Sequence, residues 1–480
     1  MTGIYALEWL TFGTGSVMVA GSSASGAISR FQLSAGQDIG LLSTSWDLAT
    51  SLSTWAREGI SAEVQGQAYM LSIESLTGTV MVQQMNASGL AAPTTLQTVS
   101  GSFVHALQVE MVNIAGQSYL AAAQMGATGL ALYQVQADFH LSLASVVVDT
   151  DKSNLTDIAD LQAVRVGATD FLISISETEN GISSYQVDPG GTLYLVDSIG
   201  PKSGFWVSGL SAVLPIEVGG QTFLITTASQ SNNLAVIRLN AQGVFFISDI
   251  ATDSRDTRFA GASALDTFDI DGRDFIAVGG TDGGISLFEL LPDGQLFHHQ
   301  SLAQSLMWNI GSITEISAVV FANEVQILVS GAGQGGVAQL VLPLAGFGAR
   351  MVGSAAANQI TGGVGDDMLL GMAGNDRLQG GAGEDVLFAG TGADVLTGGA
   401  GADTFVFTAD GQGDRITDFD IGVDRLQLAD WGRIYDVSAL DITRESFGAT
   451  IRWQNETIDI HSVNGAPIEI TDWHMDSFIF

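Results

Sequence analysis

The chain has no cysteine among its 480 residues. This absence excludes disulfide bonds, thiolate metal sites and a cysteine nucleophile. Proline is also rare, with 7 residues, so the sequence is not a Pro-rich linker. No apolar run reaches the ~18 residues of a membrane-spanning helix. The N-terminus has no basic region and no cleavage site of a classical secretory signal. We therefore expect neither a membrane span nor an N-terminal signal.

Basic side chains are scarce, because 16 Lys and Arg stand against 51 Asp and Glu, for a net charge of −35. A charge of this sign repels phosphates, which excludes nucleic acid as a partner. The partners that such a chain attracts are cations, and hard divalent cations prefer oxygen ligands. Hydrophobic residues make up 46% of the chain, which is enough for a folded core.

Seven copies of a repeat of about 50 residues occupy the chain up to about residue 345. Each copy has an apolar strand, a short polar loop and a second strand, as in residues 171–176 and 181–185. Turn residues and alternating apolar positions predict four short strands per copy. One such sheet cannot bury both faces alone, so the pattern favours a seven-bladed β-propeller, with a β-solenoid or paired sandwiches as alternatives. The first apolar positions are 50 or 52 residues apart: Val17, Tyr69, Tyr119, Phe171, Phe223, Phe275 and Ile327.

Closure of the ring is not fixed by this pattern. The chain opens almost directly on a strand at residues 4–10, and the seventh copy lacks a clear fourth strand. Residues 349–352 are the candidate for that missing strand.

Five nine-residue repeats follow between residues 361 and 405, with the pattern G-G-x-G-x-D-x-U-x, in which U is apolar. Glycines stand two, four and five positions before each aspartate, except at Met372 and Ala389. Glycine permits a tight turn with positive φ and brings carbonyl groups close to an ion. The aspartate provides a carboxylate, and the apolar residue, two positions later, points into the coil. These apolar residues are Leu369, Leu378, Leu387, Leu396 and Phe405.

Two nonapeptides form one coil of a parallel β-roll, so loops on one side are 18 residues apart. Asp367, Asp385 and Asp403 are then expected on one edge, and Asp376 and Asp394 on the other. A Ca²⁺ ion between stacked loops would reach its six to eight oxygen ligands from carboxylates and glycine carbonyls. The predicted calcium ligands are Asp367, Asp376, Asp385, Asp394, Asp403, Gly363, Gly365, Gly374, Gly381, Gly383 and Gly392.

Residues 361–405 resemble the RTX (repeats-in-toxin) calcium-binding family. The strings D-R-I-T-D-F at 414–419 and D-R-L-Q-L at 424–428 are similar to the C-terminal cap of serralysin-type RTX proteins. This resemblance implies calcium-dependent folding and export by the type I secretion machinery of Gram-negative bacteria, which reads an uncleaved C-terminal signal. The chain ends with Asp476 followed by mainly apolar residues, as such signals often do.

The expected fold class is all-β: a seven-bladed β-propeller followed by a parallel β-roll and a C-terminal β cap. We expect the propeller at residues 1–348, the roll at 349–404, and the cap with its secretion signal at 405–480.

No catalytic motif accompanies these repeats. Serralysins are zinc proteases, but H-E-x-x-H is absent, as are G-x-S-x-G and a phosphate loop. His298 and His299 are interpreted as a solvated turn, with metal binding as the minor alternative. The string D-x-D-G-x-D at 269–274 is interpreted as a hairpin turn, with a calcium turn as the alternative. Trp55, Trp206 and Trp308 are interpreted as packing residues, with a carbohydrate site as the alternative.

The sequence therefore predicts a secreted or cell-surface calcium-binding protein with a structural or adhesive role, whose propeller binds an extracellular glycan or protein. An exported enzyme that degrades polysaccharide or lactone within the propeller channel is the alternative. A component of an oligomeric layer or matrix is a third hypothesis.

Overall fold

The computed structural model describes residues 4–12, 15–22, 28–45, 56–64, 67–74, 77–86, 89–91, 94–98, 105–124, 128–136, 139–303, 311–333, 337–434 and 436–479. The chain divides into two compact units: a first one of residues 1–270 and 274–343, and a second one of residues 271–273 and 344–480. Both are built from strands, and the predicted all-β fold class is confirmed. Within the described residues, no helix is long and apolar enough to cross a membrane.

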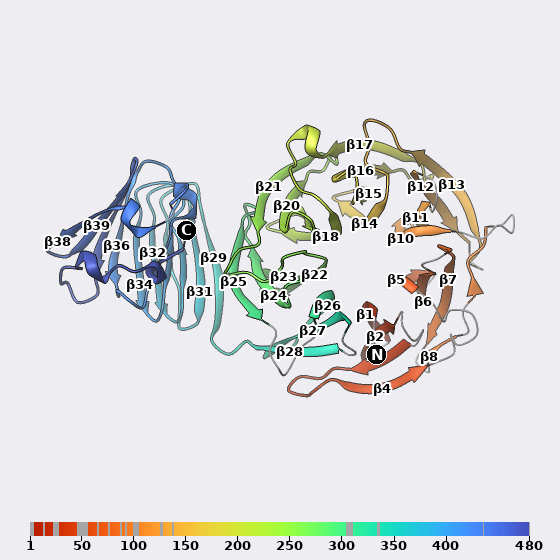
Figure 1. The fold of residues 1–480 in the computed structure, drawn as a ribbon, viewed down its shortest axis with the longest axis horizontal. Helices are drawn as coiled ribbons and strands as arrows, with labels where there is room; N and C mark the ends of the chain where they lie inside the picture. Colours follow the sequence, from red (N-terminus) through yellow and green to blue (C-terminus); the bar gives the residue numbers. More distant parts are fainter. Residues whose placement is uncertain are drawn as a thin grey trace. The chain divides into compact units, whose positions relative to one another are not determined.

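Antiparallel sheets form a ring in the first unit (Figure 1). The first strand of each sheet lies toward the centre of the ring and the last strand toward its rim. The first three sheets contain β1 (Ile4–Phe12), β2 (Gly15–Ser22), β3 (Ile28–Gln32) and β4 (Gly40–Ser45); β5 (Ala56–Val64), β6 (Gln67–Glu74), β7 (Val80–Asn86), β8 (Gly89–Leu90) and β9 (Thr94–Thr95); and β10 (Ala106–Ile114), β11 (Gln117–Gln124), β12 (Gly129–Val135) and β13 (Leu141–Val148).

The other four sheets of this unit complete the ring. They contain β14 (Ile158–Val166), β15 (Thr169–Ser176), β16 (Gly181–Val187) and β17 (Leu193–Ile199); β18 (Leu210–Val218), β19 (Gln221–Ala228), β20 (Asn233–Leu239) and β21 (Phe245–Thr252); β22 (Ala264–Ile270), β23 (Arg273–Gly279), β24 (Gly284–Leu290) and β25 (Leu296–Ala303); and β26 (Gly311–Val320), β27 (Glu324–Gly333) and β28 (Val337–Pro343).

The periodic apolar position of the sequence falls in the second strand of every sheet, from Val17 in β2 to Ile327 in β27. The middle strands are buried on both faces, as in β24, because each sheet packs between two neighbours. One core cluster joins Phe171 and Ile173 of one sheet to Leu224 and Ile237 of the next.

The ring closes without a shared sheet. Strand β1 lies against β26, and the turn after β3 bonds to the seventh sheet, where the Gly36 N–H donates to Glu324 Oε1 (2.7 Å) and Gln326 Nε2 donates to the Ser34 carbonyl (2.9 Å). The seventh sheet has three strands among the described residues. The expectation that residues 349–352 supply a fourth strand is wrong, because they lie in β29 (Phe347–Ser354), which pairs with β31 of the second unit.

Carboxylates join neighbouring blades both on the inner strands, near the centre of the ring, and on the outer strands, near its rim. On the inner strands, Asp160 accepts the Val213 N–H (2.8 Å), and Asp266 accepts the Ala318 N–H (2.7 Å). On the outer strands, Asp197 accepts the Phe245 N–H (2.9 Å). Each of these bonds spans about one repeat, so these carboxylates fix one blade to the next at the contacts named.

The second unit is a roll of two sheets that are mostly parallel (Figure 1). One sheet contains β29 (Phe347–Ser354), β31 (Asp366–Met372), β33 (Val386–Phe388), β35 (Thr404–Val406), β37 (Arg425–Gln427) and β41 (Phe478–Ile479). The other contains β30 (Gln359–Thr361), β32 (Arg377–Ala382), β34 (Val395–Ala400), β36 (Gly413–Phe419), β40 (Glu456–Ser462), β39 (Gly448–Trp453) and β38 (Asp441–Glu445). The predicted boundary at residue 404 between roll and cap stays a prediction.

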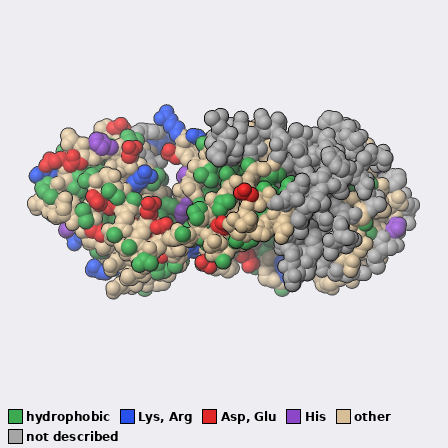
Figure 2. All heavy atoms as spheres, turned by 90° about the horizontal axis from the view of Figure 1, so that it is seen from below, with side chains coloured by type: hydrophobic (Ala, Val, Ile, Leu, Met, Phe, Trp, Pro, Cys, Tyr) green, Lys and Arg blue, Asp and Glu red, His purple; other side chains and the backbone are tan. Residues whose placement is uncertain are grey.

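Short 3-10 turns are the helical elements of the described chain: η1 (Pro201–Ser203), η2 (Ala429–Trp431), η3 (Val437–Ala439), η4 (Ile470–Asp472) and η5 (Met475–Ser477). Acidic side chains lie in small groups among uncharged ones on the face in Figure 2, rather than in a single block.

The contacts between blades generate a first prediction. Replacing Asp197 with Ala removes the acceptor of both the Phe245 and the Ser198 N–H groups. We expect the free energy of unfolding to fall by about 1–3 kcal/mol, measured as the urea midpoint in calcium. Asp170→Ala is the control, because Asp170 pairs with the exposed Arg165 at 3.4 Å, and such surface pairs contribute about 0–1 kcal/mol. Equal losses in the two variants would contradict the assigned role of Asp197.

Candidate calcium-binding site

The coil repeats every 18 residues, as the nonapeptide spacing predicts. Leu369 pairs in register with Leu387, and Leu387 with Phe405, on one sheet. Leu378 pairs with Leu396 on the other. All five apolar positions are fully buried and form the core of the roll, so the residue two positions after each aspartate does point inward.

Glycine lets the loops stack at close range. Gly383 and Gly392 have φ values of 132° and 137°, and a Cβ at Gly392 would lie 1.9 Å from the Gly374 carbonyl oxygen. Carbonyl groups of one loop therefore face the backbone of the next. Met372 departs from the pattern and still adopts a φ of 76°, a conformation that is strained for a residue with a side chain.

Two columns of aspartates run along the roll. The Asp367 N–H donates to Asp385 Oδ1 (2.8 Å), and the Asp385 N–H donates to Asp403 Oδ1 (2.9 Å). In the second column the Asp376 N–H donates to Asp394 Oδ1 (2.7 Å). The five aspartates predicted from the sequence thus form one column of three and another of two, and all are at most 4% exposed.

In three of the five column aspartates, the other carboxylate oxygen lacks a partner. Asp376, Asp385 and Asp394 each have a buried Oδ2 with no hydrogen-bond donor. An unpaired buried carboxylate oxygen is costly, whereas Ca²⁺ takes such oxygens together with carbonyl groups. No three His, Asp or Glu side chains among the described residues gather closely enough to hold an ion alone. The donor set therefore fits calcium shared between stacked loops, with Asp367, Asp385 and Asp403 in one column and Asp376 and Asp394 in the other.

The glycines that were predicted as ligands lie in the same loops. Carbonyl oxygens of Gly363, Gly365 and Gly374 face the loop one coil later, as do those of Gly381 and Gly383. Gly392 lies against Gly374. Their role as ligands stays a prediction.

Both columns continue into the cap, which the sequence analysis missed. The Asp394 N–H donates to Asp414 Oδ1 (2.9 Å), and the Asp403 N–H donates to Asp424 Oδ1 (3.0 Å). Asp418 accepts the N–H groups of Gly398 and Gly399 (both 2.9 Å). The spacings here are 20 and 21 residues, so a strict search for 18 does not find them. The strings D-R-I-T-D-F and D-R-L-Q-L contain these aspartates, so they were the sequence signal from which the continuation of the columns could have been predicted.

Burial and neighbouring charge shift the pKa values of the columns. Burial, with repulsion from Asp403 and Asp367, raises the pKa of Asp385 to about 6. Burial also raises the pKa of Asp414 to about 8, with repulsion from Asp394, Asp410 and Glu456. The calcium-free columns hence resist full ionisation.

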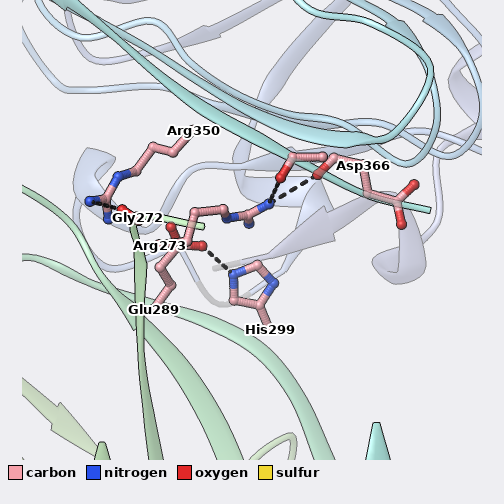
Figure 3. Close-up of polar contacts among 7 residues, drawn as sticks. Gly272, Arg273, Glu289, His299, Arg350 and Asp366 are labelled. Carbon is pink, nitrogen blue, oxygen red and sulfur yellow. Dashed lines mark hydrogen bonds and ion pairs between the residues drawn. The ribbon is translucent and has the colours of Figure 1, made fainter. Parts of the chain in front are cut away.

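The first coil is held by an arginine. Arg273 is 2% exposed, and its Nη1 donates to the carbonyl oxygens of Gly348 (3.3 Å) and Asp366 (3.0 Å), as Figure 3 shows. Its guanidinium carbon lies 4.3 Å from the centre of the Phe347 ring. Because Asp366 directly precedes Asp367, this side chain fixes the backbone where the first column begins.

Comparison with known families identifies these repeats. Residues 346–378 and 370–405 match a family model described as RTX calcium-binding nonapeptide repeat (4 copies). Residues 346–405 are RTX calcium-binding repeats. The match begins before residue 361, in agreement with β29 and β30, which already pair with the first RTX strands. The sequence analysis missed this coil, because Ala349 and Asn358 stand where later coils have aspartate, and their N–H groups donate to Asp367 and Asp376.

No curated protein matches the chain. Solved structures that match include a protein from Lactobacillus plantarum, at 14% identity and a TM-score of 0.43, over 70% of this chain and 94% of that chain. A functionally unknown protein from Desulfotomaculum acetoxidans matches at 11% identity and a TM-score of 0.42, over 67% of this chain and 98% of that chain. The RTX repeats are thus the part of the chain whose family is identified.

The structure also places the other candidate residues of the sequence analysis. His298 and His299 lie within β25, so their interpretation as a solvated turn is wrong; His299 Nε2 lies 2.8 Å from the buried Glu289 Oε2 (Figure 3). Asp271 and Gly272 form the turn between β22 and β23 with φ values of 51° and 82°, as the hairpin interpretation predicts. Trp55 and Trp308 lie outside the described residues.

The extended column predicts how strongly the loss of each aspartate lowers calcium affinity. Asp385 and Asp403 both lie between two carboxylates of the column, whereas Asp367 has Asp385 on one side and Ala349 on the other. We expect Asp385→Ala and Asp403→Ala to lower calcium affinity similarly, and each by more than Asp367→Ala. Calcium titration by calorimetry measures this order. A larger loss for Asp367→Ala would show that the column does not act as a series of shared sites.

The raised pKa values predict that, as the pH rises, the stability of the calcium-free fold falls while calcium affinity increases. A folded-state pKa of about 6 at Asp385 and Asp403 exceeds the unfolded value of roughly 3.9. The calcium-free fold therefore loses stability as the pH rises from about 4 through 6. Calcium binds the ionised form, so its affinity weakens as the pH falls through 6. Thermal unfolding of calcium-depleted protein, and calcium titration, at pH 5 and 7.5 test both trends. Parallel trends in the two measurements would contradict the assignment.

Proposed function

We propose that this protein is a secreted calcium-binding RTX protein with a structural or adhesive role, in which calcium folds the roll and the propeller carries a ligand-binding module. Two columns of buried aspartates carry this proposal, because Asp376, Asp385 and Asp394 each keep a buried Oδ2 without a hydrogen-bond donor. RTX repeats are typical of secreted proteins, and the extracellular side provides roughly millimolar calcium.

The described carboxylates of the inner propeller strands serve contacts between blades. An active site in the channel would need convergent carboxylates with histidine or tyrosine. Glu110, Asp160 and Asp266 instead accept N–H groups from the next inner strand, at 2.7–3.1 Å. These described carboxylates are committed to contacts between blades. The enzyme hypothesis therefore gains no support from them.

Export by a type I system is the second part of the proposal. Calcium is scarce in the cytosol, so the columns would stay open there and the roll would remain loosely folded. Extracellular calcium would then fill the columns and fold the roll. The propeller is predicted to fold independently of calcium.

Calcium-dependent folding of the roll alone is testable in the full chain. Hydrogen exchange with and without calcium, resolved by peptide, should show loss of protection at residues 359–479 on calcium removal and little change at residues 139–303. A ligand at a hundredfold excess over its Kd contributes roughly 2.7 kcal/mol. Unchanged exchange of the roll on calcium removal would refute the proposal.

The secretion signal is tested by a short deletion. Removing residues from 421 onward would also remove Asp424 and Glu456, so we choose deletion of residues 476–480. In a Gram-negative host with a type I exporter, we expect this variant to be lost from the medium. Asp385→Ala is the control, because it breaks the calcium column and leaves the C-terminus intact, so it should still be exported. Export of the deletion variant at the full-length level would exclude a C-terminal signal.

A further inference from the structure

Trp206 is the most exposed aromatic side chain of the described residues, at 76%. It lies in the connection from β17 to β18, after η1 and the residues Gly204 and Phe205. The sequence interpretation of this residue as a packing residue is wrong. A tryptophan that is left in water contributes little burial energy to the fold.

The connection does not require an aromatic side chain at this position. Three consecutive connections between blades share one buried anchor: Leu155, Phe205 and Phe259, each at most 1% exposed. The anchor N–H is bonded within its own connection in all three, to Asp149 Oδ1, the Gly200 carbonyl and Asp253 Oδ1, at 3.0–3.2 Å.

The residue after the anchor is small in the neighbouring connections. Thr156 follows Leu155, and Ala260 follows Phe259, whereas Trp206 follows Phe205. Since the neighbouring connections have the same buried anchor followed by threonine or alanine, the connection does not need the indole of Trp206 to form. Loops held on a rigid scaffold are where binding residues concentrate.

Hydrogen bonds hold the Trp206 loop in one shape. The Gly200 N–H donates to Ser203 Oγ (2.8 Å), and the Ser208 N–H donates to Ser231 Oγ (2.9 Å). Phe205 and Val207 are buried on either side of Trp206. The indole is therefore presented from a fixed backbone, which reduces the entropy lost when a ligand binds.

Polar side chains are exposed in this connection and in the adjacent hairpin. Lys202 and Ser203 are exposed in the same connection, and Gln230 is exposed in the adjacent hairpin, where its N–H donates to the Ser208 carbonyl (3.1 Å). An exposed indole in a connection that also carries ammonium and hydroxyl groups, with an amide group in the adjacent hairpin, suits a ligand with an apolar face and a hydroxylated edge. A pyranose ring has this chemistry. The net charge of −35 disfavours a polyanion.

We propose that Trp206 is the stacking platform of a carbohydrate-binding site on the loop face of the propeller, and that its ligand is a neutral polysaccharide. Lys202 and Gln230 provide hydrogen bonds to sugar hydroxyls. This inference rests on the proposed ligand-binding role of the propeller and is independent of the calcium sites.

The test uses the full chain in calcium, with laminarin and dextran as neutral probes and alginate as the polyanionic one. Affinity electrophoresis and tryptophan fluorescence measure binding. We expect a neutral probe to bind, Trp206→Ala to weaken its affinity about tenfold or more, and Trp206→Tyr to retain most of it. Tyr194→Ala is the matched control, because Tyr194 is a 53% exposed aromatic on the outer strand β17, and its loss should leave affinity unchanged.

Three outcomes would overturn the inference: equal affinity of Trp206→Ala and the parent protein, binding of alginate alone, or no binding of either neutral probe. A calcium titration of the same samples separates this failure from failure of the proposed calcium role. Normal calcium binding with no saccharide binding would reject the carbohydrate site only.

Discussion

The roll depends on burying carboxylates in columns, one for each coil along an edge. Each column aspartate accepts the N–H of the residue one coil earlier, so the carboxylate is part of the backbone bonding of the stack. That bond uses Oδ1 and leaves Oδ2 buried, unpartnered at Asp376, Asp385 and Asp394. A cation in the column satisfies these oxygens and removes the repulsion between neighbours. Glycine spacing, coil length and the inward apolar residue all serve this arrangement.

The propeller uses the same chemical group without needing a cation. Asp197 Oδ1 accepts the N–H of Ser198, and Oδ2 accepts the N–H of Phe245 in the next blade. Asp160 and Asp266 repeat this pattern on the inner strands. Both oxygens are thus paired within the protein. The difference between a carboxylate with both oxygens paired and one with a single oxygen paired is the physical reason to expect calcium dependence in the roll alone.

Sequence periodicity predicted the elements that repeat without interruption. The position of Val17, Phe171 and Ile327 in second strands, and the inward apolar residues of the roll, followed from constant spacing. Features at the ends of the repeats did not follow. The columns reach Asp414 and Asp424 through longer turns, which breaks the 18-residue rule. Among the described residues the seventh sheet has three strands, and β29 pairs in parallel with β31, a long-range contact that the local pattern does not contain. Exposure of Trp206 also depends on the tertiary position of its anchor, Phe205.

The continuation of the columns extends the candidate calcium site into the cap. Asp394 and Asp403 donate their N–H groups to cap aspartates, so the last RTX coil has no complete backbone bonding until β36 and β37 are in place. Glu456, at the start of β40, accepts the N–H of Gly411 and adds its charge to that of Asp414. The carboxylates near the last coil therefore include Glu456, which lies more than 40 positions after Asp414 in the chain. Such long-range bonding ties calcium binding in the final coil to folding of the hairpin β39–β40, so the roll and the cap are expected to fold as one cooperative unit.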